Sequence, residues 1–500
     1  RQMCIRDSAR EARRRARLEA GRLRHHSVFM NPVHAPDFPH GMLWLNAAPT
    51  ALQSLRGSAV ALAFVDPASS WCLQRLADLA LLQRRFGARL QVRVIAVPRF
   101  DVHRDPQAAL KRLRRFGVSF PIAHDLDWHA WQRFGIEAWP TVVLIDAQGM
   151  VVDHIVGTPG VGALENRLTA LGGPVGGPLV DPRPVETHPE PRLPLRFPTG
   201  LAVNAERLYV ADTGHHQIVE CTHAGRVMRR FGNGNADALD GDMEIASFRS
   251  PTHVALLRNE LYVADTGNHL IRRIHLGTGA VQTLLGTGKA GVPAEGPIHA
   301  PGDVALASPA GLVATNSHLH FALSGDNRVW SWDLGNRMLE CRAGSGQLGQ
   351  RDGAGVLASF AQPTGLALVQ QALYVCDTLG ASLRAVQLGG DFAKTLVGGQ
   401  GPWEFGHADG QRQQARLQAP EDVTLDPDAP VLWIADTGNG RIRSLRLGGG
   451  AVTSLDLGRR LAQPAGLAAF GGKLWIAETD AHAVLCVDLA SGAVSQVPIE

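Results

Sequence analysis

A strand–turn–strand pattern recurs six times in the second part of this chain. Each copy has a Pro-containing turn, a short apolar strand and a second strand that ends near Asp-Thr-Gly. The clearest copies are FPTGLAV (197–203) with LYVADTGHHQIV (208–219), and SPTHVAL (250–256) with LYVADTGNHLIR (261–272). Such self-similarity constrains the architecture most, because each unit has to bury its apolar face against its neighbours.

The repeat period indicates how many strands each copy contains. The Asp position of the six copies falls at Asp212, Asp265, Leu323, Asp377, Asp436 and Glu478, so the spacings are 53, 58, 54, 59 and 42 residues. The first copy offers four short strand candidates, GLAV, LYVA, QIVEC and RVMRRF, separated by turn residues. Four strands repeated six times predict an all-β, six-bladed β-propeller.

The residues of the repeat resemble the motif of a known family. Pro-x-Gly-Leu-Ala, followed by Tyr-Val-Ala-Asp-Thr-Gly-Asn-x-x-Ile, resembles the NHL repeat, and the resemblance covers residues 197–500. A weaker copy pairs APGDVAL (300–306) with LHFALSGDNRVW (319–330). Three residues depart from the motif, Leu323, Leu379 and Glu478, and we expect them to weaken single turns without changing the fold.

Residues 30–172 follow a different pattern, in which strands alternate with helices. Apolar strands are expected at 58–67 and 90–98, helices at 71–87 and 105–117, and a hairpin and a last helix complete the segment. This α/β order resembles the thioredoxin fold, and Trp139-Pro140-Thr141 matches the cis-proline position of that family. The tandem of both domains resembles the NHL repeat-containing protein 2-like family and its bacterial relatives.

The redox motif of the thioredoxin fold is degenerate here. Thiol–disulfide exchange needs Cys-x-x-Cys at a helix N-terminus, where one thiolate attacks and the second resolves the mixed disulfide. This chain offers only SSWCLQR (69–75), so either Ser69 takes the attacking position and Cys72 the resolving one, or Cys72 attacks and Arg75 replaces the resolver. The resemblance therefore implies a degenerate site of Cys72, Ser69 and Pro140 without two-thiol exchange. A one-thiol role for Cys72 in redox sensing stays open beside a purely structural one.

A second candidate site lies on the propeller. The residue after Pro-x in the six copies is Gly200, His253, Asp303, Gly365, Asp422 and Gly466. In an NHL propeller this position is expected near the mouth of the central channel, where His253, Asp303 and Asp422 would converge. Such a ring could bind a metal or a cationic ligand, or it could be a hydrated polar lining. We expect no bound metal and no cofactor, because the ring supplies few donors.

Composition limits the classes of partner. The net charge is +3, from 49 basic and 46 acidic residues, and much of the excess lies in the first 24 residues. We therefore expect no nucleic-acid binding from the ordered domains. No pair of the six cysteines has disulfide or zinc spacing, which favours a reducing, cytoplasmic location. No apolar run approaches the ~20 residues of a membrane span.

Two further segments complete the expected organisation. Residues 1–29 form a basic tail that we expect to be disordered or not native, and residues 173–196 form a Pro/Gly-rich linker. The function expected from this organisation is an interaction scaffold that binds a protein partner on the propeller face, without enzymatic activity. The alternatives are a thiol-dependent redox protein or sensor using Cys72, similar to a thiol–disulfide oxidoreductase, and a metal-dependent propeller lyase or hydrolase at the channel mouth.

Overall fold

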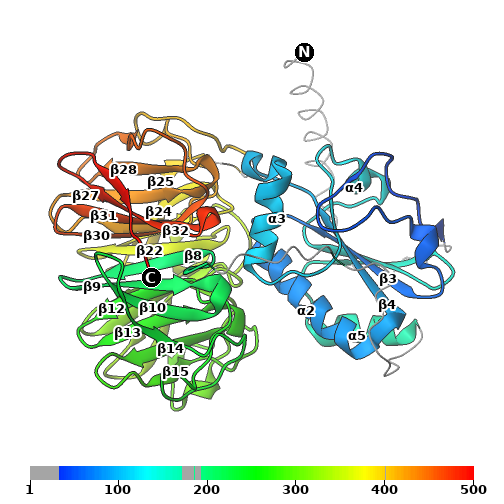
Figure 1. Ribbon diagram of the computed structural model, residues 1–500, viewed down its shortest axis with the longest axis horizontal. Helices are drawn as coiled ribbons and strands as arrows, with labels where there is room; N and C mark the ends of the chain where they lie inside the picture. Colours follow the sequence, from blue (N-terminus) through cyan, green and yellow to red (C-terminus); the bar gives the residue numbers. More distant parts are fainter. Residues whose placement is uncertain (1–32, 172–184, 186–192, 400, 402) are drawn as a thin grey trace.

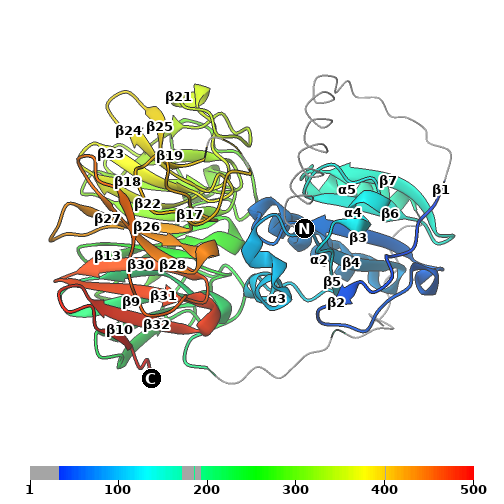
Figure 2. The ribbon, with the colours of Figure 1, turned by 90° about the horizontal axis from the view of Figure 1, so that it is seen from above.

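The computed structural model describes residues 33–171, 185, 193–399, 401 and 403–500. The predicted tail (1–29) and most of the predicted linker (173–196) lie outside the described residues. Two domains lie side by side, and helices α2 (Ser70–Phe86) and α3 (Pro106–Arg115) of the first domain lie between its sheet and the propeller (Figures 1 and 2). Among the described residues no helix is long and apolar enough to span a membrane.

The first domain is built on a seven-stranded sheet with the order β1-β7-β6-β3-β4-β5-β2. β3 pairs with β4, and β4 with β5, in parallel, whereas β6 runs antiparallel to β3. The strands are β1 Val33–His34, β2 Leu43–Trp44, β3 Ala59–Val65, β4 Leu90–Ala96, β5 Ile122–His124, β6 Thr141–Ile145 and β7 Met150–Val156.

Helices cover both faces of this sheet. They are α2 Ser70–Phe86, α3 Pro106–Arg115, α4 His129–Arg133 and α5 Val161–Ala170. Successive residues of β3 point to opposite faces, so that Ala61 and Ala63 pack in the core beneath α2, α3 and α5, and Leu62 and Phe64 in the core beneath α4. The Trp139–Pro140 peptide bond is cis. The predicted strands and helices are all present, and the domain is thioredoxin-like.

The second domain is a six-bladed propeller, as the repeats predicted. Each blade contains four consecutive antiparallel strands, from the central channel outwards. Blades 1 to 3 are β8 Pro198–Val203, β9 Arg207–Asp212, β10 Gln217–Thr222 and β11 Val227–Phe231; β12 His253–Leu257, β13 Glu260–Asp265, β14 Leu270–His275 and β15 Val281–Leu285; and β17 Pro309–Ala314, β18 His318–Leu323, β19 Arg328–Asp333 and β20 Met338–Ala343.

Blades 4 to 6 repeat this arrangement. They are β22 Pro363–Val369, β23 Ala372–Asp377, β24 Ser382–Gln387 and β25 Phe392–Gly398; β26 Asp422–Leu425, β27 Val431–Asp436, β28 Arg441–Arg446 and β29 Val452–Ser454; and β30 Pro464–Phe470, β31 Lys473–Glu478, β32 Ala483–Asp488 and β33 Val494–Gln496. Two short strands, β16 Gly296–Pro297 and β21 Gly353–Ala354, extend blades 3 and 4 at their outer edges.

The prediction for the inner strand of the third blade was wrong. This strand is β17, which begins at Pro309, and the segment 300–306 lies outside it. Pro301–Asp303 forms an exposed 3-10 turn, in which the Asp303 side chain accepts a hydrogen bond from the Ala300 N–H. The Pro-x-Asp sequence of this turn imitates the repeat, while the true copy, SPAGLVA (308–314), follows a few residues later.

The threonine of the Asp-Thr-Gly motif joins each blade to the next. The Thr213 hydroxyl donates to the carbonyl of Pro251 in blade 2, at 2.7 Å, and Thr479 of blade 6 closes the ring on the carbonyl of Pro198 in blade 1, also at 2.7 Å. The same bond forms at five of the six junctions, from Thr213, Thr266, Thr378, Thr437 and Thr479. Blade 3 carries Ser324 instead, which bonds to Ser308 of its own blade.

The aspartate of the motif also binds the loop before the blade and a buried arginine. Asp265 accepts the backbone N–H of Arg249 with one oxygen and the guanidinium of Arg272 with the other. Arg272 is fully buried and also contacts Asp240 of the interblade loop. Blades 4 and 5 repeat this ion pair between motif Asp and strand Arg, with Arg384 and Arg443. In these three blades the motif thus fixes the blade to the loop that precedes it.

Candidate functional site: the face shared by the two domains

The N-terminus of α2, where the redox motif would lie, contacts the propeller. Ser69 is the N-cap residue, and its hydroxyl accepts the Cys72 N–H. The Ser70 N–H donates to Oε1 of Gln362 at 2.7 Å, and Nε2 of Gln362 donates to the carbonyl of Ala68 at 2.9 Å. One propeller side chain therefore satisfies a free helix N–H and a loop carbonyl of the first domain at once.

Ser69 occupies the helix terminus, and Cys72 lies one turn inside. Cys72 is completely buried, and its Sγ accepts the Asp66 N–H at 3.3 Å. Burial, together with the neighbouring Asp66 carboxylate, raises the pKa of the Cys72 thiol well above its ordinary value. This placement favours the register with Ser69 in the attacking position and Cys72 in the resolving one. The thiol stays protonated at neutral pH and is not accessible to a disulfide.

The cis-proline side of the site is covered by aromatic rings. Trp139, which precedes Pro140, packs against Trp128 and Trp131 of its own domain, with ring centroids 5.0 and 4.6 Å away. Trp403 of the propeller lies 6.3 Å from Trp139. The three residues of the degenerate redox site, Ser69, Cys72 and Pro140, therefore lie close to the interface, where both domains contribute to the packing.

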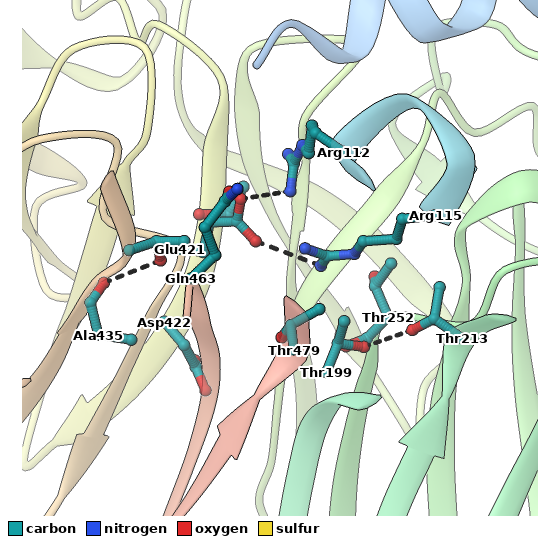
Figure 3. Close-up of polar contacts among 12 residues, drawn as sticks. Arg112, Arg115, Thr199, Thr213, Thr252, Glu421, Asp422, Ala435, Gln463 and Thr479 are labelled. Carbon is teal, nitrogen blue, oxygen red and sulfur yellow. Dashed lines mark hydrogen bonds and ion pairs between the residues drawn. The ribbon is translucent and has the colours of Figure 1, made fainter. Parts of the chain in front are cut away.

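Two arginines of α3 bind one glutamate of the propeller (Figure 3). Arg112 Nη1 lies 2.5 Å from Glu421 Oε1, and Arg115 Nη2 lies 3.2 Å from Glu421 Oε2. All three side chains are buried. Burial acts to raise the pKa of Glu421, but the two guanidiniums outweigh it and hold this pKa below its ordinary value. The carboxylate is therefore ionised and shared between two cations from the other domain.

An apolar cluster extends the contact around this ion pair. Phe100 of the first domain is fully buried, and its ring lies 4.9 Å from that of Phe405. Ala68, Ala361, Leu379, Ala381 and Ala419 belong to the same cluster. The interface thus combines apolar burial with a buried charge that is paired, which limits the cost of burying it.

Departures from the repeat motif make several of these contacts. Leu379 and Asp480 stand where other blades have the motif glycine. Leu379 packs on the interface, and its carbonyl accepts Arg99 Nη2, while the carbonyl of Asp480 accepts Lys111 Nζ. A side chain at Gly267 would lie 2.6 Å from the Arg249 carbonyl. Blades 4 and 6 have a side chain at this position. In these blades the residue equivalent to Arg249 is a small alanine, Ala361 or Ala462.

The channel ring differs from the prediction at one residue. Since β17 begins at Pro309, the third blade contributes Gly311 and not Asp303, which lies elsewhere on the surface. The ring is therefore Gly200, His253, Gly311, Gly365, Asp422 and Gly466. At Gly466 a Cβ would collide with the Thr199 carbonyl of the next blade, so the inner strands approach so closely that glycine is required there.

His253 and Asp422 face each other across this ring from blades 2 and 5. His253 Nε2 lies 3.8 Å from Asp422 Oδ1, which is beyond a hydrogen bond. Burial lowers the pKa of His253 to about 4 and raises that of Asp422 to about 7. Asp422 also accepts the N–H groups of Val423 and Leu467, at 2.9 and 2.8 Å. The two side chains line the channel, and Asp422 links blade 5 to blade 6.

The described residues offer no group of three or more His, Cys, Asp or Glu that could hold a metal ion. The prediction named only Ser69, Cys72, Pro140, His253, Asp303 and Asp422, and it missed Glu421, Gln362, Arg112 and Arg115. One signal for Glu421 was present in the sequence. The residue after the motif proline is Thr199, Thr252 and Thr364 in three blades, Ala310 and Ala465 in two others, and a carboxylate only at Glu421.

Comparisons with known proteins agree with this two-domain organisation. The NHL repeat family matches residues 195–221. NHL repeat-containing protein 2 of Homo sapiens is 29% identical over 93% of this chain and 72% of its own length. The protein SUPPRESSOR OF QUENCHING 1, chloroplastic, of Arabidopsis thaliana is 29% identical over 92% of this chain and 47% of its own length.

A solved streptogramin B lyase aligns with 62% of this chain and 85% of its own, at 13% identity and a TM-score of 0.40. The similarity to NHL repeat-containing protein 2 extends through both domains in the same order. This chain, with a thioredoxin-like domain followed by a six-bladed propeller, is therefore similar to NHL repeat-containing protein 2 along both domains.

Proposed function

We propose that this protein is a non-enzymatic interaction scaffold, in which a redox-inactive thioredoxin-like domain is fixed on one face of the propeller. The contact of Gln362 with the α2 N-terminus is the observation that carries the proposal. It places a propeller side chain on the backbone that a disulfide substrate would have to approach. The fully buried Cys72 supports the same reading, because its raised pKa leaves little thiolate at neutral pH.

The partner of this scaffold is a protein that binds the propeller on the face turned away from the first domain. That face carries the hairpin turns between the inner two strands of each blade, for example at 204–206 and 315–317. Propellers present such turns on a rigid frame, so that binding costs little ordering of the chain. We place the protein in the cytoplasm, which its five described cysteines, all free, support.

The direct test is insulin reduction with a thioredoxin reference. The protein should show no turnover above the uncatalysed rate, and a rate near the reference would overturn the proposal. Reaction of the native protein with a chromogenic disulfide should leave Cys72 unmodified until denaturant is added. Fast native labelling of Cys72 would instead favour the thiol-sensor alternative.

A gain-of-function series separates the two obstacles to redox activity, which are the missing thiol and the covered helix end. Ser69→Cys restores the two-thiol spacing but leaves Gln362 in place, so we expect little reductase activity. The triple variant Ser69→Cys, Gln362→Ala and Glu421→Ala should reduce insulin at least ~10 times faster than Ser69→Cys alone. The reason is that a docking free energy of only about 1.4 kcal/mol lowers the fraction of molecules with an uncovered α2 N-terminus tenfold. Equal rates in both variants would show that the propeller does not cover the site.

A further inference from the structure

A cavity remains where the two domains meet above the channel. This cavity has a volume of about 150 Å³ and lies between α2 and α3 on one side and blades 2 to 5 on the other. One water needs only ~10–15 Å³ of such space, and an engineered cavity of about this size binds benzene. Ala77, an exposed residue of α2, lies on the cavity wall and marks its opening to solvent.

The charged side chains around this cavity are mostly cationic. Arg112, Arg115 and Arg249 line it, against the single carboxylate of Glu421. Arg112 and Arg115 are buried, and Arg249 lies exposed at the rim. Both lining histidines, His253 and His269, are neutral at pH 7, because burial lowers the pKa of each to about 4. The walls therefore carry an excess of positive charge that a small anion would balance.

Two buried nitrogens of the lining have no hydrogen-bond partner among the described residues. They are Nε of Arg115, a donor on a side chain only 4% exposed, and Nε2 of His253, which is an acceptor because Nδ1 of this neutral imidazole donates to Thr252 Oγ1. His269 adds a donor, because its Nδ1 accepts the Ser308 N–H and its proton must lie on Nε2. Buried donors without acceptors are unfavourable, so a ligand that brings oxygen acceptors would be stabilised here.

We propose that this interdomain cavity binds a small oxyanion of up to about six heavy atoms, a carboxylate or inorganic phosphate. The Arg115 guanidinium supplies the main charge-assisted contact. The Ser250 hydroxyl and the Nε2–H of His269, both on the propeller wall, supply neutral donors. The site exists only while the domains are docked, since each contributes part of the wall. It rests on the domain docking of the proposed function, whereas the scaffold role of the propeller can hold whether or not an anion binds.

Calorimetric titration of the full chain with sodium phosphate, and separately with sodium acetate, tests the site. We expect saturable binding of at least one anion. Arg115→Gln should weaken it at least about tenfold, the effect of losing one charge-assisted contact. Arg114→Gln removes a charge from the same helix without touching the cavity, and should leave the affinity within about twofold.

Because Arg115→Gln could weaken binding by undocking the domains, a second variant leaves every charge in place. Ala310→Leu fills the cavity from the propeller side and should abolish binding. Ala310→Val fills it less and is close in shape to the threonine of other blades. No saturable heat with either anion in the unaltered protein would overturn the proposal. Unchanged affinity in Ala310→Leu would also overturn it, because the anion would then bind elsewhere.

Discussion

A single residue, Glu421, distinguishes blade 5 from the other blades and links the two domains. Three other blades have Thr199, Thr252 and Thr364 at the equivalent position, and these side chains bond inside the propeller. The side chain of Glu421 instead pairs with two arginines of α3. Removing one partner of a buried ion pair leaves the other charges uncompensated, which is far costlier than losing an exposed pair.

Glu421→Gln should therefore destabilise the docked protein by about 3–5 kcal/mol. The measurement is urea unfolding followed by tryptophan fluorescence, since Trp139 and Trp403 lie together at the interface. Glu340→Gln is the control, because Glu340 pairs with Arg342 at the half-exposed surface, and its loss should cost no more than about 1 kcal/mol. Equal effects of the two variants would show that the buried Glu421 ion pair contributes no more to stability than an exposed one.

His269 accounts for part of the pH dependence of stability. Burial lowers its pKa to about 4, against an ordinary value of 6.5 in the unfolded chain. Between these values the unfolded state binds a proton and the native state does not, so stability falls as the pH falls from 6.5 to 4. At most about 3 kcal/mol is involved. Asp422 acts in the opposite direction, because its native pKa is raised to about 7.

The matched variant is His269→Asn, since Asn327 accepts the equivalent backbone N–H, that of Gln362, at 3.0 Å in blade 3. The variant keeps the acceptor and removes the titration. Its free energy of unfolding should vary less between pH 6.5 and 4 than that of the unaltered protein. Parallel pH profiles would show that His269 is not the group responsible.

At the scale of the element, the junctions between blades depend on one repeated hydrogen bond. Thr479→Val keeps the shape of the side chain but leaves the Pro198 carbonyl without this donor. We expect a loss of about 1–3 kcal/mol in urea unfolding. Thr287→Val, at an exposed loop, should change stability by less than about 0.5 kcal/mol. No difference between these variants would show that the junction bond contributes nothing.

The elements themselves were largely predictable from the sequence. Period-2 strands and turn residues located the blades, and helix spacing located α2 and α3, because these signals are local. The third inner strand was misplaced, because the Pro301 turn imitates the repeat and only packing distinguishes it from Pro309. The domain interface was not predictable, because Arg112 and Glu421, or Ser70 and Gln362, are about 300 residues apart and carry no shared pattern.

At the scale of the whole molecule, the two domains behave as one body held by a small number of contacts. Gln362→Ala together with Glu421→Ala removes the bond to the α2 N-terminus and the shared carboxylate, but touches neither domain core. Small-angle scattering should show a larger radius of gyration, and circular dichroism an unchanged content of strands and helices. An unchanged radius would show that the apolar cluster around Phe100 suffices for docking.

The ring closure at Thr479 and Pro198 has a consequence for how such a chain can be rearranged. All four strands of every blade are contiguous in sequence, so no strand is borrowed to seal the ring. The seam between blades 6 and 1 uses the same threonine-to-carbonyl bond as four internal junctions. A circular permutant opened at any of these five junctions would therefore keep the threonine-to-carbonyl bond that closes the ring, whereas one opened between blades 3 and 4 would lack it.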